Sequence, residues 1–211
     1  MLHKAKAEAM TPAGRAAIFI LEETLIANPR STEEHRRLMW ANKRGHTLRV
    51  ARLARRVSTL MGLQGQDAAI VEVAAILHDA GRFEQIRRFA TYTDSVSMDH
   101  GAASAAIVRK HRGALLAAGL HTDAIRTVEE TVRMHNKLPK PHEPFAADII
   151  RDCDRLDIVA SAIRTHENKR HRHVFFHAAG AVPERFTPDS GCVDLVLGRQ
   201  PLPSGALGDP S

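Results

Sequence analysis

Cysteine is scarce in this sequence, and long apolar runs are absent. Cys153 and Cys192 lie far apart and without zinc-ligand spacing, so the sequence predicts neither a disulfide framework nor a cysteine-based metal site. The longest apolar stretches, residues 16–21 and 114–120, are far shorter than the roughly 18 residues that a membrane-spanning helix needs. Residues 1–26 also lack the pattern of a signal peptide. We therefore expect a cytoplasmic protein with no membrane partner.

The composition is that of a folded domain with an uneven positive charge. The chain has 211 residues, of which 44% are hydrophobic and 26% charged, which is enough for one domain with a core of its own. The net charge is +6, and the densest basic stretch, residues 43–56, holds six Lys or Arg and no acid. Such a stretch is typical of a solvated helix face, and it also favours attraction of phosphate-bearing ligands or nucleic acid.

Helix signals are frequent and strand signals are few. Ser31 with Glu34 fits a capping box, and Ser97 is placed as a helix N-cap. With the spacing of apolar residues, such signals predict helices over about 12–27, 31–61, 66–79, 97–112, 122–135 and 144–163. Residues 82–97 are typical of a loop or broken helix, and a short hairpin is expected at 186–197. No internal repeat or alternating strand–helix pattern is present, so the predicted fold class is all-α.

Five polar residues interrupt otherwise apolar helix faces. His46 lies on the second predicted helix, in line with an apolar stripe formed by Val50, Leu53, Val57 and Leu60. The other four end or follow apolar faces further along the chain, and they are His78, Asp79, His135 and Asp154. Each alone is more often a satisfied core residue than a ligand. As a set they fit a divalent metal, because neutral imidazole and carboxylate suit iron, manganese, zinc, nickel or cobalt.

Three segments of the sequence resemble the HD domain superfamily of metal-dependent phosphohydrolases. They are RGHTLRV at 44–50, LHDAGR at 77–82 and IIRDCDRLD at 149–157. The His-Asp pair follows the first His by 32 residues, and the last Asp lies 76 residues beyond that pair's His. The resemblance implies an HD-domain helical bundle at residues 1–165, with the motifs in about 30–165. Residues 166–211 are then expected to form an irregular C-terminal extension whose last ten or so residues are disordered.

The resemblance also implies which residues bind metal. Dinuclear members of the superfamily use two further histidines between the His-Asp pair and the last Asp, and His100 and His135 match them in order. The implied ligands are His46, His78, Asp79, His100, His135 and Asp154. They would hold one or two divalent ions per chain, which could be manganese, iron, nickel, cobalt, zinc or magnesium. Catalytic roles are expected for Asp79 as the bridging ligand and for Arg82 and Lys137. Arg49, Arg82 and Lys137 are the candidates for binding substrate phosphate.

Three closely spaced aspartates of the sixth predicted helix, Asp152, Asp154 and Asp157, are candidates for the last ligand position. At 100° per residue, Asp154 and Asp157 share a face with Ile150 and Ile158, whereas Asp152 points about 160° away from Asp154. Asp152 is therefore expected to point outward. The superfamily pattern selects Asp154, and Asp157 is expected to support a ligand or pack against a neighbouring helix.

The leading functional prediction is a phosphohydrolase that acts through metal-activated water. Its substrate is expected to be a small phosphorylated metabolite such as a nucleotide, cleaved as a phosphomonoester or phosphodiester. A second reading is a di-iron oxygenase of the inositol oxygenase type, a branch of the same superfamily that uses four His and two Asp. A third reading, from another class, is a nucleotide or nucleic-acid binding module that uses the basic stretch. No recognised nucleic-acid motif accompanies that stretch, so we expect a small molecule as partner.

Overall fold

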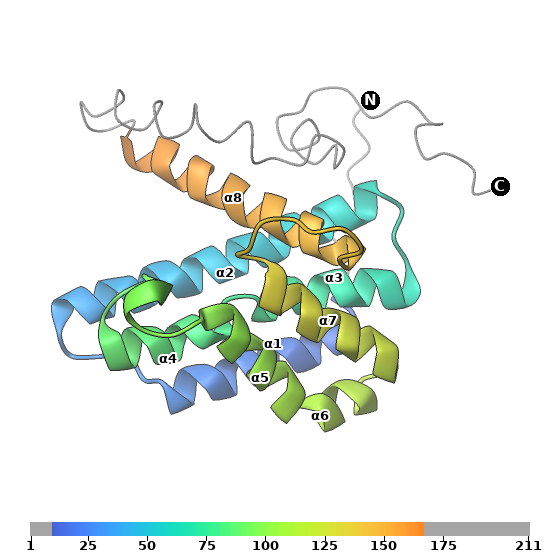
Figure 1. The fold of residues 1–211 in the computed structure, drawn as a ribbon, viewed down its shortest axis with the longest axis horizontal. Coiled ribbons are helices and arrows are strands. Elements are labelled where there is room, and N and C mark those ends of the chain that lie inside the picture. The colour runs from blue at the N-terminus through green and yellow to red at the C-terminus, as the bar shows by residue number, and fades with distance from the viewer. Residues whose placement is uncertain (1–9, 167–211) are drawn as a thin grey trace.

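The structure is a computed structural model that describes the backbone of residues 10–166 and the side chains of residues 10–160. Within this range all regular secondary structure is helical (Figure 1), which confirms the predicted all-α class. The helices are α1 Pro12–Ala27, α2 Glu34–Leu60, α3 Gly65–Leu77, α4 Ala80–Phe89, the 3₁₀ helix η1 Asp94–Val96, α5 His100–Lys110, α6 Arg112–Ala117, α7 Thr122–Met134 and α8 Phe145–His166. The expected hairpin, the C-terminal extension and Cys192 lie outside the described residues. None of the described helices has the length and apolar character needed to cross a membrane.

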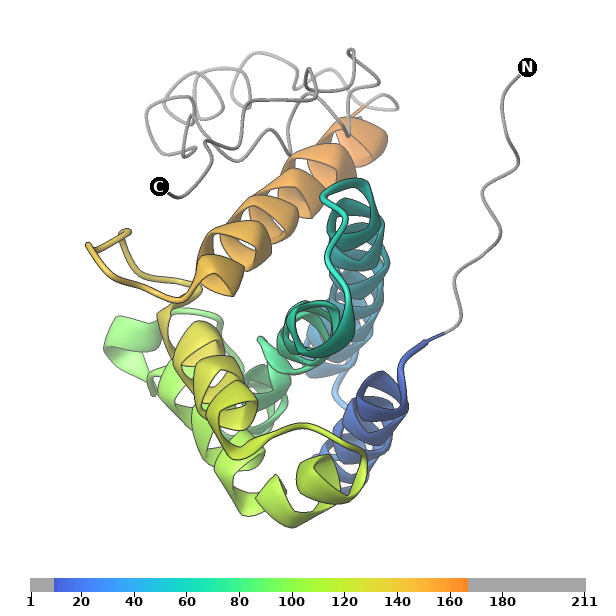
Figure 2. The same cartoon turned by 90° about the vertical axis from the view of Figure 1, so that its right-hand side faces the viewer.

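Helix α3 is the centre of the bundle. It contacts α1, α2, α7 and α8, and Figure 2 shows it, in teal, surrounded by other helices. Every residue from 69 to 77 is buried, because this segment is apolar on all sides except at Glu72. The end of α3 therefore places His78 and Asp79 deep inside the bundle, where both are at most 2% exposed.

Two predicted helix starts are wrong. Helix α2 begins at Glu34 with Glu33 as its N-cap and without a side-chain cap, and the Ser31 hydroxyl instead accepts a hydrogen bond from the Glu33 amide. Helix α5 is capped by the Asp99 side chain rather than by Ser97. Both errors arise because several hydroxyl or carboxylate side chains precede each helix, and spacing alone does not decide which one reaches the free amides.

The prediction of a loop or broken helix over residues 82–97 is also wrong in part. Helix α4 occupies its first half and ends in a left-handed residue, Ala90, at φ 50°. A helix usually ends this way at glycine, so alanine gave no stop signal. Leu60, placed on the apolar stripe of α2, is 50% exposed because it lies at the helix end, whereas Val50 and Val57 are fully buried.

Glu72 fastens the first helix to the bundle. Its carboxylate accepts hydrogen bonds from the Thr11 amide (2.9 Å) and hydroxyl (2.6 Å), and it pairs with the Arg55 Nε at 2.9 Å. A Cβ atom on Gly14 would lie 2.4 Å from this carboxylate, so glycine at this position lets α1 approach Glu72 without displacing its side chain. Glu72 itself is 2% exposed.

We predict that Glu72→Gln lowers the free energy of unfolding by about 2–3 kcal/mol, because Arg55 loses its counter-charge in a partly buried position. Urea denaturation measures this loss. Glu84→Gln is the matched control, since Glu84 forms an exposed pair with Arg88, and it should change stability by less than about 0.5 kcal/mol. Equal effects of the two substitutions would refute the fastening role.

Candidate metal centre

Three parts of the bundle bring four predicted ligands together. His46 comes from α2, His78 and Asp79 from the junction of α3 and α4, and Asp154 from α8. One donor atom from each lies within 4.8 Å of the others, and we call this set the first group. His46 Nε2 is 2.8 Å from Asp154 Oδ1, and Asp79 Oδ2 is 3.5 Å from His46 Nε2 and 3.3 Å from His78 Nε2.

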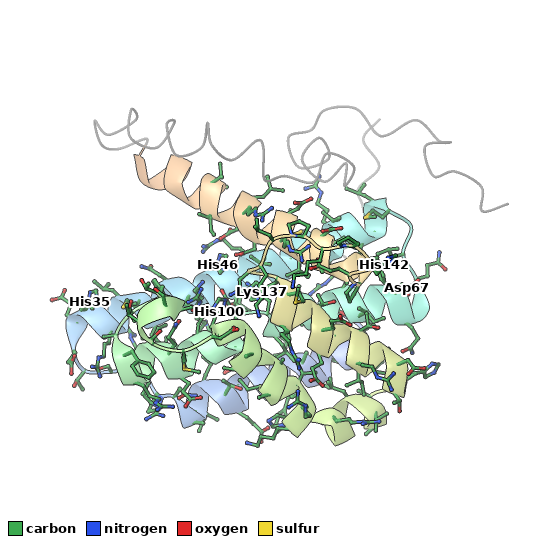
Figure 3. All side chains as sticks on the ribbon, in the orientation of Figure 1. His35, His46, Asp67, His100, Lys137 and His142 are labelled. Carbon is green, nitrogen blue, oxygen red and sulfur yellow. The ribbon has the colours of Figure 1, made fainter. Side chains whose placement is uncertain are left out.

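A second group shares Asp79 with the first. It contains Asp79, His100 at the start of α5 and His135 at the end of α7. Asp79 Oδ1 is 3.5 Å from His100 Nε2 and 3.7 Å from His135 Nε2, and the two imidazole nitrogens are 3.2 Å apart. Figure 3 shows His46 and His100 on different helices in the middle of the molecule. One oxygen of Asp79 thus faces each group, which is the arrangement of a bridging carboxylate.

Backbone carbonyls fix two of the histidines. Nδ1 of His78 lies 2.8 Å from the Ala75 carbonyl, and Nδ1 of His135 lies 2.7 Å from the Val132 carbonyl. A carbonyl only accepts hydrogen bonds, so in the neutral ring Nδ1 carries the proton and Nε2 keeps its lone pair. Each lone pair then faces Asp79 and its group, as a metal ligand requires.

Carboxylates fix the other two histidines. Nδ1 of His46 lies 2.8 Å from Asp157, and Nδ1 of His100 lies 2.6 Å from Asp94. Asp157 therefore supports His46, as expected for an aspartate that is not itself the ligand. Asp94 has no counterpart among the predicted residues.

Burial and unsatisfied donors show that these residues fit a divalent metal. His46 and His78 are at most 6% exposed, and their Nε2 atoms have no hydrogen-bond partner among the described residues. Buried polar atoms are normally paired, so two such nitrogens beside two carboxylates fit a divalent cation as their shared partner. Imidazole and carboxylate donors suit zinc, manganese, iron, nickel or cobalt.

The electrostatics of the first group also favour a cation. Burial lowers the pKa of His46, but the neighbouring carboxylates of Asp154, Asp157 and Asp79 outweigh burial and raise the pKa from 6.5 to about 10. Burial raises the pKa of Asp79, yet Lys43 and His78 hold it well below its usual value. A proton on His46 balances the neighbouring carboxylates, and a divalent ion held by the same residues would supply that positive charge instead.

In the second group, His100 is in the protonation state that binds metal. Burial lowers the pKa of His100 from 6.5 to about 4, and the neighbouring Arg82 and His135 act in the same direction, against Asp79 and Asp94. His100 is therefore neutral at pH 7, and neutral imidazole is the form that binds metal.

Lys43 is a residue of the centre that the sequence analysis missed. Its Nζ lies 2.6 Å from Asp79 Oδ2, and its side chain is 16% exposed. It precedes His46 by three residues, so the two side chains share one face of α2. That spacing could have identified Lys43, but Lys43 is one of six basic residues in the stretch 43–56, and nothing in the sequence distinguishes it from the other five.

The predicted phosphate-binding cations are all engaged with acids in the structure. Arg82 donates to Asp94 at 2.9 Å, while its Nε lies 3.5 Å from Asp79 Oδ1. Arg49 binds both oxygens of Asp157, at 2.7 and 3.0 Å. Lys137 lies 3.2 Å from the Asp99 carboxylate at the edge of the centre, where Figure 3 labels it. Of these three cations, Arg82 contacts the predicted ligand Asp79.

The prediction that Asp152 points outward is wrong. Asp152 is fully buried, because α8 packs against α2, α3 and α7 and so is covered on more than one face. The neighbouring Arg151, 1% exposed, binds Glu143 and lies 3.4 Å from the Met134 carbonyl, which closes this side of α8. A single helical period cannot predict burial on two sides.

These observations define a class of protein: an all-α bundle whose core carries two His/Asp groups that share one aspartate. Residues 44–158 match the HD domain family, and the chain belongs to that family. Among solved structures, the chain is similar to a predicted HD superfamily hydrolase from an uncultured Thermotogales bacterium. The two are 19% identical, the match covers 87% of this chain and 89% of that chain, and the TM-score is 0.48. No curated protein matches the chain.

Proposed function

We propose that this protein is a metal-dependent phosphohydrolase that acts on a small phosphorylated metabolite such as a nucleotide. Family membership and the two His/Asp groups support a metal-dependent hydrolase. The observation that carries the phosphate specificity is the position of two cations. Lys43 and Arg82 both lie within 3.5 Å of Asp79, on the carboxylate that the two groups share.

The chain's residues have distinct roles in the proposed reaction. His46, His78, Asp79 and Asp154 would hold one divalent ion, and Asp79 with His100 and His135 would hold a second. When bound, such ions supply Lewis-acid activation of water and of the phosphoryl group.

The cations act on the substrate. Lys43 and Arg82 lie next to opposite oxygens of Asp79, and each would donate a hydrogen bond to a phosphoryl oxygen of a substrate bound at the centre. Both stabilise the negative charge that grows as water attacks phosphorus and the ester bond breaks.

The proposal is tested on protein purified without chelator. Metal content is measured, and a panel of nucleotides, sugar phosphates and a phosphodiester is assayed for released phosphate or alcohol with manganese, nickel, cobalt, zinc, iron or magnesium. Metal-dependent release that stops with a chelator and returns with one of these metals is the expected result. Oxygen uptake by the iron-loaded protein, with no ester cleaved, would instead identify an oxygenase.

We predict that Lys43→Ala retains bound metal and lowers kcat/KM by roughly 30- to 1,000-fold. This corresponds to a loss of about 2–4 kcal/mol of transition-state stabilisation, the range for one preorganised hydrogen-bond donor. Metal affinity should not fall, because the ammonium competes with metal for Asp79. Lys110→Ala, which removes an exposed lysine on α5, is the control and should have normal activity. Loss of metal from the Lys43 variant would show that this lysine maintains the centre and does not contact the substrate.

A further inference from the structure

A second basic site lies away from the metal centre. A cavity of about 240 Å³ opens between the segment that joins α1 to α2 and the end of α4. Its lining residues are Pro29, Arg30, Ser31, Thr32, Arg36, Trp40, Ile86 and Arg87. Three of the eight are arginines and none is acidic, so the cavity walls carry a concentrated positive charge.

Two of the arginines are held in place by the protein. Arg87 Nε donates to the Asn28 side-chain oxygen at 2.8 Å, and Arg36 donates to the Arg87 carbonyl at 3.1 Å. Arg36 Nε also lies 3.3 Å from the carboxylate of Glu33, an exposed residue outside the lining. The guanidinium groups are thus positioned before any ligand arrives, which reduces the entropy cost of binding.

Many donors around the cavity remain available. Among the described residues, nothing accepts a hydrogen bond from Arg30 or from the terminal nitrogens of Arg87. The hydroxyl of Ser31 accepts from the Glu33 amide, which leaves its proton to donate. The first turn of α2 opens beside these residues without a side-chain cap. All of these groups would favour an anion.

The cavity is separate from the metal centre. Arg36 precedes His46 by ten residues on α2, and Arg87 follows Asp79 by eight residues along α4. At about 1.5 Å per helical residue, these intervals correspond to about 15 and 12 Å. Figure 3 shows His35 at the far end of α2 from His46. A ligand in the cavity would therefore not occupy the metal centre.

We propose that this cavity binds the phosphate group of a small metabolite. Three guanidinium groups lie around one cavity and, within the described part of the chain, only Arg36 pairs with an acid, Glu33, so a bound oxyanion would reduce the repulsion among them. Arginine binds phosphate through two parallel hydrogen bonds, a geometry that chloride cannot use. The volume fits a phosphate and a small attached group but not a large ligand. The proposal does not depend on what the metal centre catalyses.

Trp40 provides the test, because it lines the cavity and is the single tryptophan of the chain. Inorganic phosphate is titrated into the full-length protein while Trp40 fluorescence is recorded, with sodium chloride added to a parallel sample at equal ionic strength. We expect a saturable change with phosphate alone. No change beyond that of chloride would overturn the proposal.

Substitutions test whether phosphate binds in this cavity. Arg30→Gln combined with Arg87→Gln should raise the phosphate midpoint at least about tenfold, since two charged donors are lost. Arg52→Gln combined with Arg56→Gln removes two exposed arginines elsewhere on α2 and should leave the midpoint unchanged. If the first pair does not fold by circular dichroism, Arg30→Gln alone should still raise the midpoint, because no described residue pairs with that side chain. Equal midpoints in all variants would refute the site.

A single-stranded oligonucleotide is the last probe, since nucleic acid carries the same phosphate chemistry. Weak oligonucleotide binding that is insensitive to the Arg30 and Arg87 changes supports a small-metabolite site. Binding tighter than that of phosphate and lost in the same pair would assign the cavity to nucleic acid and overturn the proposal.

Discussion

Replacement of Asp79 by alanine is expected to abolish metal binding and hydrolysis together while the helical bundle survives. Asp79 is the one residue common to both ligand groups, with Oδ2 facing His46 and His78 and Oδ1 facing the second group. Its loss removes a ligand from each group at once. If the bound metals supply at least about 4 kcal/mol to the reaction, turnover should fall by at least roughly 1,000-fold.

The readouts are metal content by elemental analysis, far-ultraviolet circular dichroism and release of phosphate. Asp79→Asn is a second variant of nearly equal volume, which keeps the packing around Lys43 if the alanine variant is unstable. Asp123→Ala is the control, because the Asp123 side chain is 88% exposed and should not affect any of the three readouts. Full metal content and activity in both Asp79 variants would mean that the centre has been misassigned.

The candidate metal ligands, and the helices on which they lie, were predicted from the sequence. His46, His78, Asp79 and Asp154 each interrupt an apolar helix face, which identified them as candidates, and the resemblance to the HD superfamily implied that they lie together. The structure brings all four together with His100 and His135. Their binding of metal remains a prediction.

The residues that contact the candidate ligands and hold them in position could not be predicted in the same way. Asp94 lies in the short 3₁₀ helix between α4 and α5, where no periodicity shows which side chains face the core, yet its carboxylate contacts His100, Arg82 and Gln85. Lys43 lies within a run of basic residues, and only the packing of α2 beside Asp79 distinguishes it. Side-chain roles in loops and charge-rich segments depend on tertiary contacts between distant parts of the chain.

Substitution of His135 tests whether the chain binds one metal ion or two. Its Nε2 belongs to the second group alone, 3.7 Å from Asp79 Oδ1 and 3.2 Å from the His100 nitrogen. His135→Ala is expected to lower the metal content from two ions per chain to one and nearly to remove activity, because the second group keeps only two donors. The first group does not contain His135, so its metal should remain.

The alternative role makes a different prediction for the same variant. If His135 contacted substrate phosphate, the alanine variant would keep its metal content and raise KM more than it lowers kcat. His121→Ala is the control, since His121 lies exposed at the opposite end of α7 and should alter neither quantity. Elemental analysis of the wild type and both variants separates the two roles. A wild-type value near one ion per chain would refute the dinuclear centre, whereas two ions falling to one in the His135 variant alone would establish it.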